Sequence, residues 1–432
     1  MSAPTPPARR NPIWIPPFLG RVPAEVNDAQ LRILGAVAFA IYFENYDQAM
    51  LTQAIKQIAA SFALAEAEIG NLLGWVRLGA VPAILLLPLA DRFGRRRMFL
   101  LSVFGMSAAT TLSAFAPDAT VFVAFQMFSR LCMVIGAATA YVIVAEELHA
   151  EHRGWGIGIL GALGAFGVGL SALIFAAIDV LPFGWRAMYL VGVVPLLVLP
   201  ILRRNVPETA RFGAEAEAAA QSAWWRPLYD LVRVFPGRAA AIAVIGGSSV
   251  GAIAAAYNYS AYFVQQDHGW APGQYSAMLL VAGVIGVLGH PIAGRLADRF
   301  GRRPIGCLFF AAFPALAIGF YVVPSVWLPA LWIPMSFSMM GGLTIARALA
   351  TELFPTAFRG TSSGLLQLVD TLGSAAALFL VSALTERFGG AIPAVRAVVW
   401  VSLLAAVVVW MVPETSRREL EQISGDEPPK SG

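Results

Sequence analysis

Charged residues are scarce in this sequence, and their scarcity argues against an ordinary soluble protein. Asp, Glu, Lys and Arg make up 13% of the 432 residues, hydrophobic residues make up 58%, and the mean hydropathy is +0.69. A soluble globular chain carries roughly a quarter charged residues. The apolar runs approach the ~20 residues that a helix needs to cross a bilayer. The sequence therefore predicts a polytopic membrane protein.

Cysteine, lysine and catalytic motifs are also scarce, and each absence argues against a class of function. Cys132 and Cys307 lie in apolar segments and are too few for a disulfide framework or a metal site. The only lysines are Lys56 and Lys430, and the arginines lie between apolar runs, so we expect no nucleic-acid partner. The sequence has no HExxH motif and no phosphate-binding loop. We therefore expect neither an enzyme nor a bound metal or cofactor.

The positions of the apolar runs predict how the chain crosses the membrane. Helical spans are predicted at 31–54, 68–90, 98–116, 120–146, 154–180 and 186–203, then at 238–264, 273–296, 304–322, 326–352, 360–384 and 392–412. Arginines gather in alternate loops, and cytoplasmic loops are the ones enriched in Lys and Arg. This pattern predicts twelve transmembrane helices with both termini in the cytoplasm.

A polar stretch near the middle divides the chain into two sets of six predicted helices. The predicted domains are a cytoplasmic N-terminal tail (1–30), an N-terminal six-helix bundle (31–203), a cytoplasmic linker (204–237), a C-terminal six-helix bundle (238–412) and a cytoplasmic C-terminal tail (413–432). Within the linker, Trp224 and Trp225 suit either a surface helix at the headgroups or a disordered segment.

Three pairs of matching strings show that the two halves arose by duplication. LADRFGRR occurs at 89–96 and again at 296–303, so that Asp298 follows Asp91 by 207 positions. AEELHAEHRG at 145–154 matches TELFPTAFRG at 351–360, and VPETARF at 206–212 matches VPETSRR at 412–418, both with an offset of 206. Nearly equal offsets for three separate pairs indicate a tandem duplication of a six-helix unit.

These strings resemble the loops of a known family of transporters. LADRFGRR is similar to the signature loop of the major facilitator superfamily, and AEELHAEHRG and TELFPTAFRG resemble its fourth-to-fifth and tenth-to-eleventh loops. VPETARF and VPETSRR resemble the segments that close each half in its sugar-porter and metabolite (aromatic or organic acid):proton symporter branches. The resemblance implies an all-α, multi-pass cell-membrane protein built from two six-helix bundles. It also implies a charged cytoplasmic gate, for which the candidates are Asp91, Arg95, Glu146, Arg153, Glu208, Asp298, Arg302, Glu352, Arg359 and Glu414.

Charged residues inside the predicted spans of the first half point to a buried network. Glu44 and Asp47 lie three residues apart in the first helix and therefore share a face. Arg77 in the second helix and Arg130 in the fourth lie at comparable depth. A charge at the bilayer centre costs about 2.5–3.5 kcal/mol, so such residues require a reason. We interpret them as a proton-coupling group around a central cavity; a purely structural ion network is the alternative.

The partner of Asp47 stays open at this stage. The string NYDQA resembles the first-helix motif of proton-coupled sugar and aromatic-acid porters, which implies that Asp47 is the proton site and pairs with an Arg in the fourth helix. In this sequence the position of that Arg is occupied by Gln126, and Arg130 follows one turn later, about 6 Å away along the axis. This offset raises Arg77 as an alternative partner.

The second half carries fewer charges and more neutral polar groups. Asp370 lies near mid-depth in the eleventh helix and extends the proton-coupling set. Candidate substrate-binding residues, chosen as amide and hydroxyl groups in apolar surroundings, are Gln126, Tyr257, Asn258, Tyr262 and Gln367. Packing between helices is the alternative role for these side chains.

The sequence thus predicts a secondary active transporter of a small organic solute, an organic or aromatic acid or a sugar, driven by the proton gradient. Buried arginines favour an anionic substrate, because guanidinium pairs with carboxylate through two hydrogen bonds. The alternatives are a proton-coupled efflux antiporter of small molecules or drugs, and a non-transporting receptor with a transporter fold. We expect a monomer in the lipid bilayer.

Overall fold

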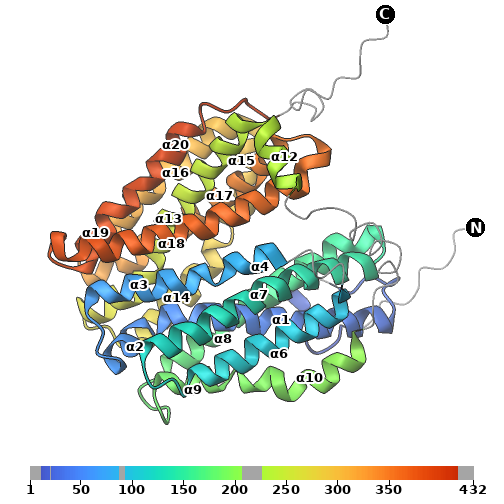
Figure 1. Cartoon of the computed structure of the whole chain (residues 1–432), viewed down its shortest axis with the longest axis horizontal. Helices are drawn as coiled ribbons and strands as arrows, with labels where there is room; N and C mark the ends of the chain where they lie inside the picture. Colours follow the sequence, from blue (N-terminus) through green and yellow to red (C-terminus); the bar gives the residue numbers. More distant parts are fainter. Residues whose placement is uncertain (1–10, 20, 87–92, 207–225, 417–432) are drawn as a thin grey trace, which may run out of the picture. The chain divides into compact units, whose positions relative to one another are not determined.

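The computed structural model describes residues 11–19, 21–86, 93–206 and 226–416, and within these ranges every regular element is helical (Figure 1). Most of the predicted linker, with Trp224 and Trp225, lies outside the described residues. The chain divides into two compact units, Met1–Leu51 with Pro82–Ser222, and Thr52–Val81 with Ala223–Gly432. The segment 52–81 therefore packs with helices of the second half of the sequence.

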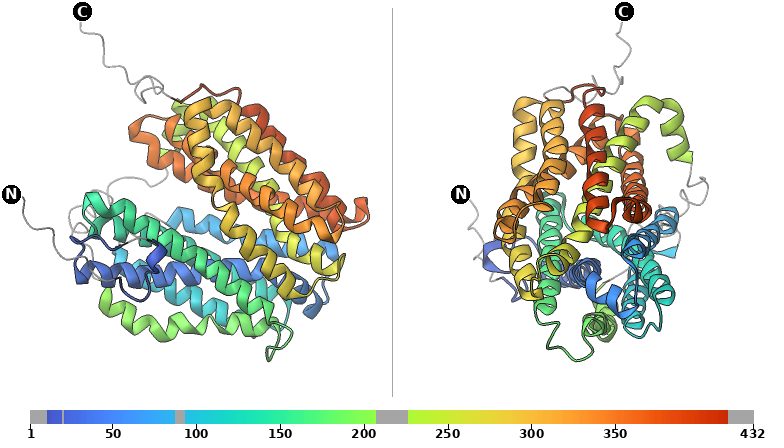
Figure 2. Two further views of the ribbon diagram at one scale, coloured as in Figure 1. Left: turned by 180° about the vertical axis from the view of Figure 1, so that it is seen from behind. Right: turned by 90° about the vertical axis from the view of Figure 1, so that its left-hand side faces the viewer.

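The first unit contains seven α-helices among its described residues; the last two residues of α1 and the first two of α4 belong to the second unit. They are α1 (Asp28–Gln53), α4 (Ala80–Leu86), α6 (Arg95–Ser113), α7 (Ala119–Glu147), α8 (Arg153–Ala176), α9 (Trp185–Leu190) and α10 (Val193–Asn205). Figure 2 shows these helices lying side by side in two further views.

The second unit contains the remaining described helices. They are α2 (Ile55–Ser61), α3 (Glu66–Leu78), α12 (Arg226–Val234), α13 (Pro236–Gln266), α14 (Pro272–Gly286), α15 (Gly289–Phe300), α16 (Arg302–Phe320), α17 (Leu328–Glu352), α18 (Arg359–Phe388), α19 (Ala391–Val398) and α20 (Ser402–Val408). Short 3₁₀ turns, η3 (Ser325–Trp327) and η5 (Val399–Val401), adjoin α17 and α20.

Nine helices among the described residues are long and apolar enough to cross a membrane. Their bounds follow the predicted spans closely, as in Ala119–Glu147 for 120–146 and Arg359–Phe388 for 360–384. Three predicted spans are broken, between α3 and α4, between α9 and α10 and between α14 and α15, and in a fourth η5 separates α19 from α20. The three breaks come three or four residues before a proline, Pro82, Pro195 or Pro291, because proline lacks the N–H that would bond the carbonyl four residues earlier.

Glycines allow helices within each unit to pack backbone against backbone. In the first unit, Gly167 of α8 lies against the backbone of Tyr42 in α1. In the second unit, a Cβ added to Gly251 of α13 would lie 2.9 Å from the carbonyl oxygen of Gly373 in α18. Small residues permit this close approach between helices in lipid, where hydrophobic burial does not drive association.

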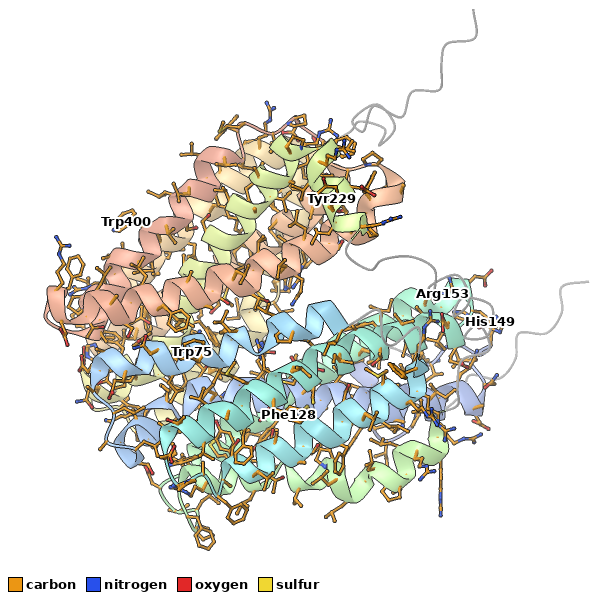
Figure 3. All side chains as sticks on the ribbon, viewed as in Figure 1. Trp75, Phe128, His149, Arg153, Tyr229 and Trp400 are labelled. Carbon is orange, nitrogen blue, oxygen red and sulfur yellow. The ribbon has the colours of Figure 1, made fainter. Side chains whose placement is uncertain are left out.

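Large apolar side chains also lie on the outside of the helices, as expected for a surface that faces lipid. Phe128 of α7 is 53% exposed and Trp400 of η5 is 49% exposed; both are labelled in Figure 3. A soluble protein rarely exposes many such residues together.

Candidate functional site

Asp47 is the centre of a buried polar cluster in the first unit. This α1 residue is only 3% exposed, and its Oδ2 accepts a hydrogen bond of 2.8 Å from the hydroxyl of Ser129 in α7. The Ser129 hydroxyl in turn lies 3.1 Å from that of Thr110 in α6. Three helices of one unit therefore position this carboxylate.

Arg130 is the cation of the same cluster. It follows Ser129 on α7 and interacts electrostatically with both Glu44 and Asp47. Among the described residues, Asp47 Oδ1 and Arg130 Nε are buried and have no hydrogen-bond partner. Buried polar atoms normally have one, so Asp47 Oδ1 can accept and Arg130 Nε can donate a further hydrogen bond.

The two arginines that the sequence left as candidate partners of Asp47 belong to different units. Arg130 accompanies Asp47 in the first unit, whereas Arg77 belongs to α3 in the second unit and interacts with Tyr257. The one-turn offset that counted against Arg130 is about 6 Å, a distance that a long and flexible Arg side chain spans.

Gln126 lies one turn before Arg130, and its side chain makes a hydrogen bond inside the first unit. Its side chain is buried, and Nε2 donates a 3.0 Å hydrogen bond to the hydroxyl of Ser113. This contact joins α7 to the end of α6.

Asp370 has a cationic neighbour that the sequence analysis missed. It lies on α18, its Oδ1 is buried without a hydrogen-bond partner in the described part of the chain, and it interacts electrostatically with Arg347 of α17. Arg347 falls inside the apolar span predicted at 326–352, so a count of charges within spans finds it. Gln367, one turn earlier on α18, is exposed.

The candidate binding residues of α13 contact helices on both sides. The ring of Tyr257 lies 5.8 Å, centroid to centroid, from that of Trp332 in α17. Asn258 Oδ1 accepts a 2.9 Å hydrogen bond from Thr52 Oγ1. Both residues therefore also hold helices together in the second unit.

Tyr262 belongs to a group that we call the Glu66 cluster, formed by Glu66, Tyr262 and Ala391. Glu66 Oε1 accepts a 2.9 Å hydrogen bond from the Tyr262 hydroxyl, and Oε2 accepts one of the same length from the backbone N–H of Ala391. The cluster joins the start of α3 to α13 and to the N-terminus of α19. Sequence reasoning missed Glu66 because it precedes the predicted span and resembles an ordinary loop acid.

In the first unit, the described candidate gate residues form one ion pair. Arg95, at the start of α6, pairs with Glu146 at the end of α7, and the two side chains are 10% and 13% exposed. Arg153 Nε donates a 3.3 Å hydrogen bond to the carbonyl oxygen of Leu148. Asp91 and Glu208 lie outside the described residues.

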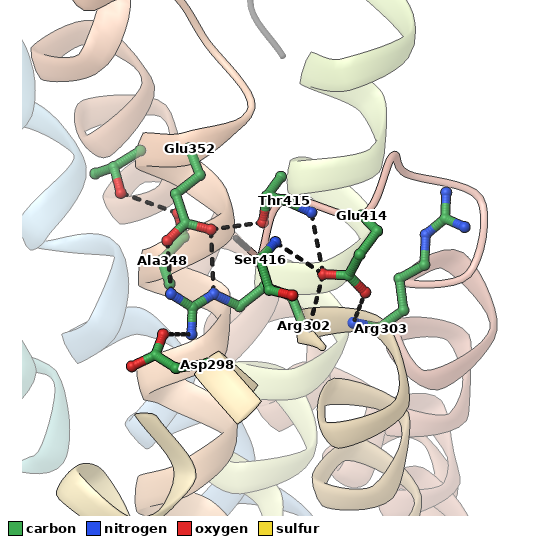
Figure 4. Close-up of polar contacts among 9 residues, drawn as sticks. Asp298, Arg302, Arg303, Ala348, Glu352, Glu414, Thr415 and Ser416 are labelled. Carbon is green, nitrogen blue, oxygen red and sulfur yellow. Dashed lines mark hydrogen bonds and ion pairs between the residues drawn. The ribbon is translucent and has the colours of Figure 1, made fainter. Parts of the chain in front are cut away.

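The second unit has a larger network at the matching place (Figure 4). Arg302 binds Glu352 through two hydrogen bonds of 2.8 and 3.1 Å, and it also pairs with Asp298 at 2.8 Å. Thr415 Oγ1 donates a 2.5 Å hydrogen bond to Glu352. Arg359 has a buried Nε without a hydrogen-bond partner among the described residues. The ion pairs of both networks join helices of the same unit.

Glu414 caps a helix. Its carboxylate accepts hydrogen bonds from the backbone N–H groups of Arg302, Arg303, Thr415 and Ser416, the first two at the start of α16. Partial burial by itself raises the pKa of Glu414, but the four N–H donors outweigh it and lower the pKa below its usual value. Glu414, one of the candidate gate residues, therefore caps the start of α16.

Transport proteins of bacteria resemble this chain over most of its length. It is 25% identical to the cis,cis-muconate transport protein of Acinetobacter baylyi, covering 78% of this chain and 83% of that protein. It is 25% identical to the niacin transporter NiaP of Acinetobacter baylyi (90% and 95% covered). It is also 25% identical to the 3-(3-hydroxy-phenyl)propionate transporter of Escherichia coli (94% and 99% covered).

Solved transporter structures share the fold. An inward-facing bacterial homologue of the human lysosomal transporter Spinster has a TM-score of 0.75 at 16% identity, with 89% of this chain and 97% of that chain covered. The xylose transporter XylE from E. coli, in an inward open conformation, has a TM-score of 0.70 at 20% identity, with 91% and 99% covered. The sequence profile of the Major Facilitator Superfamily matches residues 37–262 and 244–431. The chain is therefore a multi-pass membrane transporter, not an enzyme, and belongs to the major facilitator superfamily.

Proposed function

We propose that this protein carries a small organic or aromatic acid across the cell membrane together with protons. The named substrates of the three relatives, muconate, niacin and hydroxyphenylpropionate, are all carboxylic acids. Arginines within the spans suit such a substrate, because guanidinium binds carboxylate in a bidentate manner. The xylose transporter shares the fold at 20% identity, and that likeness does not support a sugar substrate.

The observation that carries the proposal is the charge balance of the Asp47 cluster. Two carboxyl groups, Glu44 and Asp47, accompany one guanidinium, that of Arg130. Arg keeps its charge under physiological conditions, so only the acids can take up or release a proton. With both acids ionised, the cluster has an excess negative charge inside the membrane, which one bound proton removes. A cluster of this composition couples proton binding to any ligand that approaches Arg130.

We further propose the arrangement in which this chemistry operates. The protein has twelve transmembrane helices with both termini in the cytoplasm, works as a monomer by alternating access, and uses the proton gradient without a cofactor. Asp370 and Arg347 form a second charged pair for substrate or proton, and the candidate gate residues at the ends of α6 and α16 respond to opening and closing on the cytoplasmic side.

The test is transport by the purified protein in proteoliposomes. An inward-directed pH gradient is imposed, labelled aromatic and organic acids are screened for uptake, and an internal dye reports protons. We expect uptake of a carboxylate that carries protons with it. Asp47→Asn should abolish accumulation of substrate against its gradient but retain exchange of substrate across the membrane. The reason is that the Asn amide stays neutral and cannot bind and release a proton.

The matched control is Asp179→Asn, which neutralises an exposed acid in the loop after α8 and should transport like the wild type. Accumulation with normal proton flux in Asp47→Asn would refute the coupling role. If substrate efflux instead drove protons inward, the direction of the proposal would be wrong and an antiporter would be established.

A further inference from the structure

A basic groove lies between the first turns of α6 and the last turn of α10 in the first unit. It has a volume of about 390 Å³, and its lining includes Arg96, Arg97 and Arg203, with the apolar Leu101, Phe104 and Leu199. Arg96 donates a 2.5 Å hydrogen bond to the main-chain carbonyl of Arg203, which holds the two helix ends together. We propose that this groove binds an anionic membrane phospholipid, with its phosphate on the arginines and an acyl chain on the apolar side chains.

The charge of the groove calls for an anion. Arg97 and Arg203 are exposed, and the described residues give neither of them an acidic partner. By contrast, the neighbouring Arg95 is paired with Glu146. The first turn of α6 carries arginines and no acid, so positive side chains lie at the positive end of the helix dipole, where an anion is favoured. Guanidinium groups bind phosphate oxygens through directed hydrogen bonds.

The order of charged and apolar side chains along the groove favours a lipid over a soluble phosphate. Leu101 and Phe104 follow Arg97 by four and seven residues and therefore lie on the same face of α6. They are 62% and 51% exposed, and Phe104 lies about 10 Å further along the helix than Arg97. Cations at one end and exposed apolar side chains below them match a phospholipid headgroup and its chain. Basic pockets between spans on the cytoplasmic side are suited to acidic headgroups.

The test is a lipid titration of the full-length protein in detergent, read by native mass spectrometry. We expect phosphatidylglycerol to bind more tightly than phosphatidylcholine. The double variant Arg97→Gln/Arg203→Gln should bind phosphatidylglycerol about thirtyfold more weakly. The double variant Arg204→Gln/Arg233→Gln removes the same charge from exposed arginines outside the groove, and it should bind like the wild type.

A second variant tests the apolar part of the site. Phe104→Ser should weaken phosphatidylglycerol binding but leave that of glycerol phosphate unchanged, since the soluble anion has no chain. Equal losses in the two Arg double variants would overturn the proposal, because the attraction would then come from net charge alone. Competition by glycerol phosphate at the same concentration as phosphatidylglycerol would overturn the lipid assignment. Melting of all variants is compared, so that misfolding is recognised separately.

Discussion

The close approach of α13 and α18 leads to a prediction that distinguishes the effect of helix packing on stability from the effect of helix propensity. A Cβ added to Gly373 would lie 2.6 Å from the carbonyl carbon of Gly247, whereas non-bonded carbons prefer about 3.5–4.0 Å. Gly373→Ala therefore forces the two helices about 1 Å apart. Overpacking of this kind costs about 1–3 kcal/mol, more than the roughly 0.8–1 kcal/mol that Ala gains over Gly in a helix.

The control is on the same helix. Gly364 of α18 has nothing within 4 Å of an added Cβ, so Gly364→Ala gains the propensity without the clash. Thermal denaturation of the purified protein, followed by the loss of monodisperse protein on size exclusion, should show a lower midpoint for Gly373→Ala. Gly364→Ala should melt at or above the wild-type midpoint. Equal midpoints for the two variants would refute the reasoning that backbone contact holds α13 against α18.

Two further predictions concern acids at helix ends. Glu66→Ala leaves the Tyr262 hydroxyl and the Ala391 N–H without their acceptor and should destabilise the protein by about 1.5–3 kcal/mol. Thermal denaturation measures this loss, with Asn71→Ala at an exposed position as the control. The pKa of Glu414 is lower in the folded protein than its usual value. The ionised Glu414 should therefore stabilise the protein fully at neutral pH, and this stabilisation should be lost as the pH falls from the usual pKa through the lowered pKa of the folded state. The difference in melting temperature between wild type and Glu414→Gln should therefore shrink on acidification, and a difference that grew would contradict the capping role.

Much of the fold could be predicted because a membrane-spanning helix is recognisable from its own local sequence. A span needs a long apolar run, so the bounds of α7, α13 and α18 lie within a few residues of the predicted ones. The breaks before Pro82 and Pro291 were missed, since both prolines lie in otherwise continuous apolar runs. Lipid tolerates such prolines where neighbouring helices supply partners for the freed groups.

The candidate site was harder to predict, because a residue's role depends on neighbours that the sequence does not show. Glu44 and Asp47 were recognised as unusual from their apolar surroundings. Ser129, which donates to Asp47, looks like any small residue of a span until α1 and α7 are packed together. Arg347 was visible as a charge in a span, but its proximity to Asp370 depends on how α17 meets α18.

The sequence by itself determined the membrane class, the duplication and the family, because hydropathy, motif spacing and loop charge are properties of local strings. Only the tertiary structure decided that Arg130 interacts with Asp47 within the first unit. It likewise decided that Glu414 caps α16 and that segment 52–81 packs with the second half. The physical reason is that hydrogen bonds and ion pairs act over a few ångströms, and distances that short between separate helices are set by packing rather than by position in the chain.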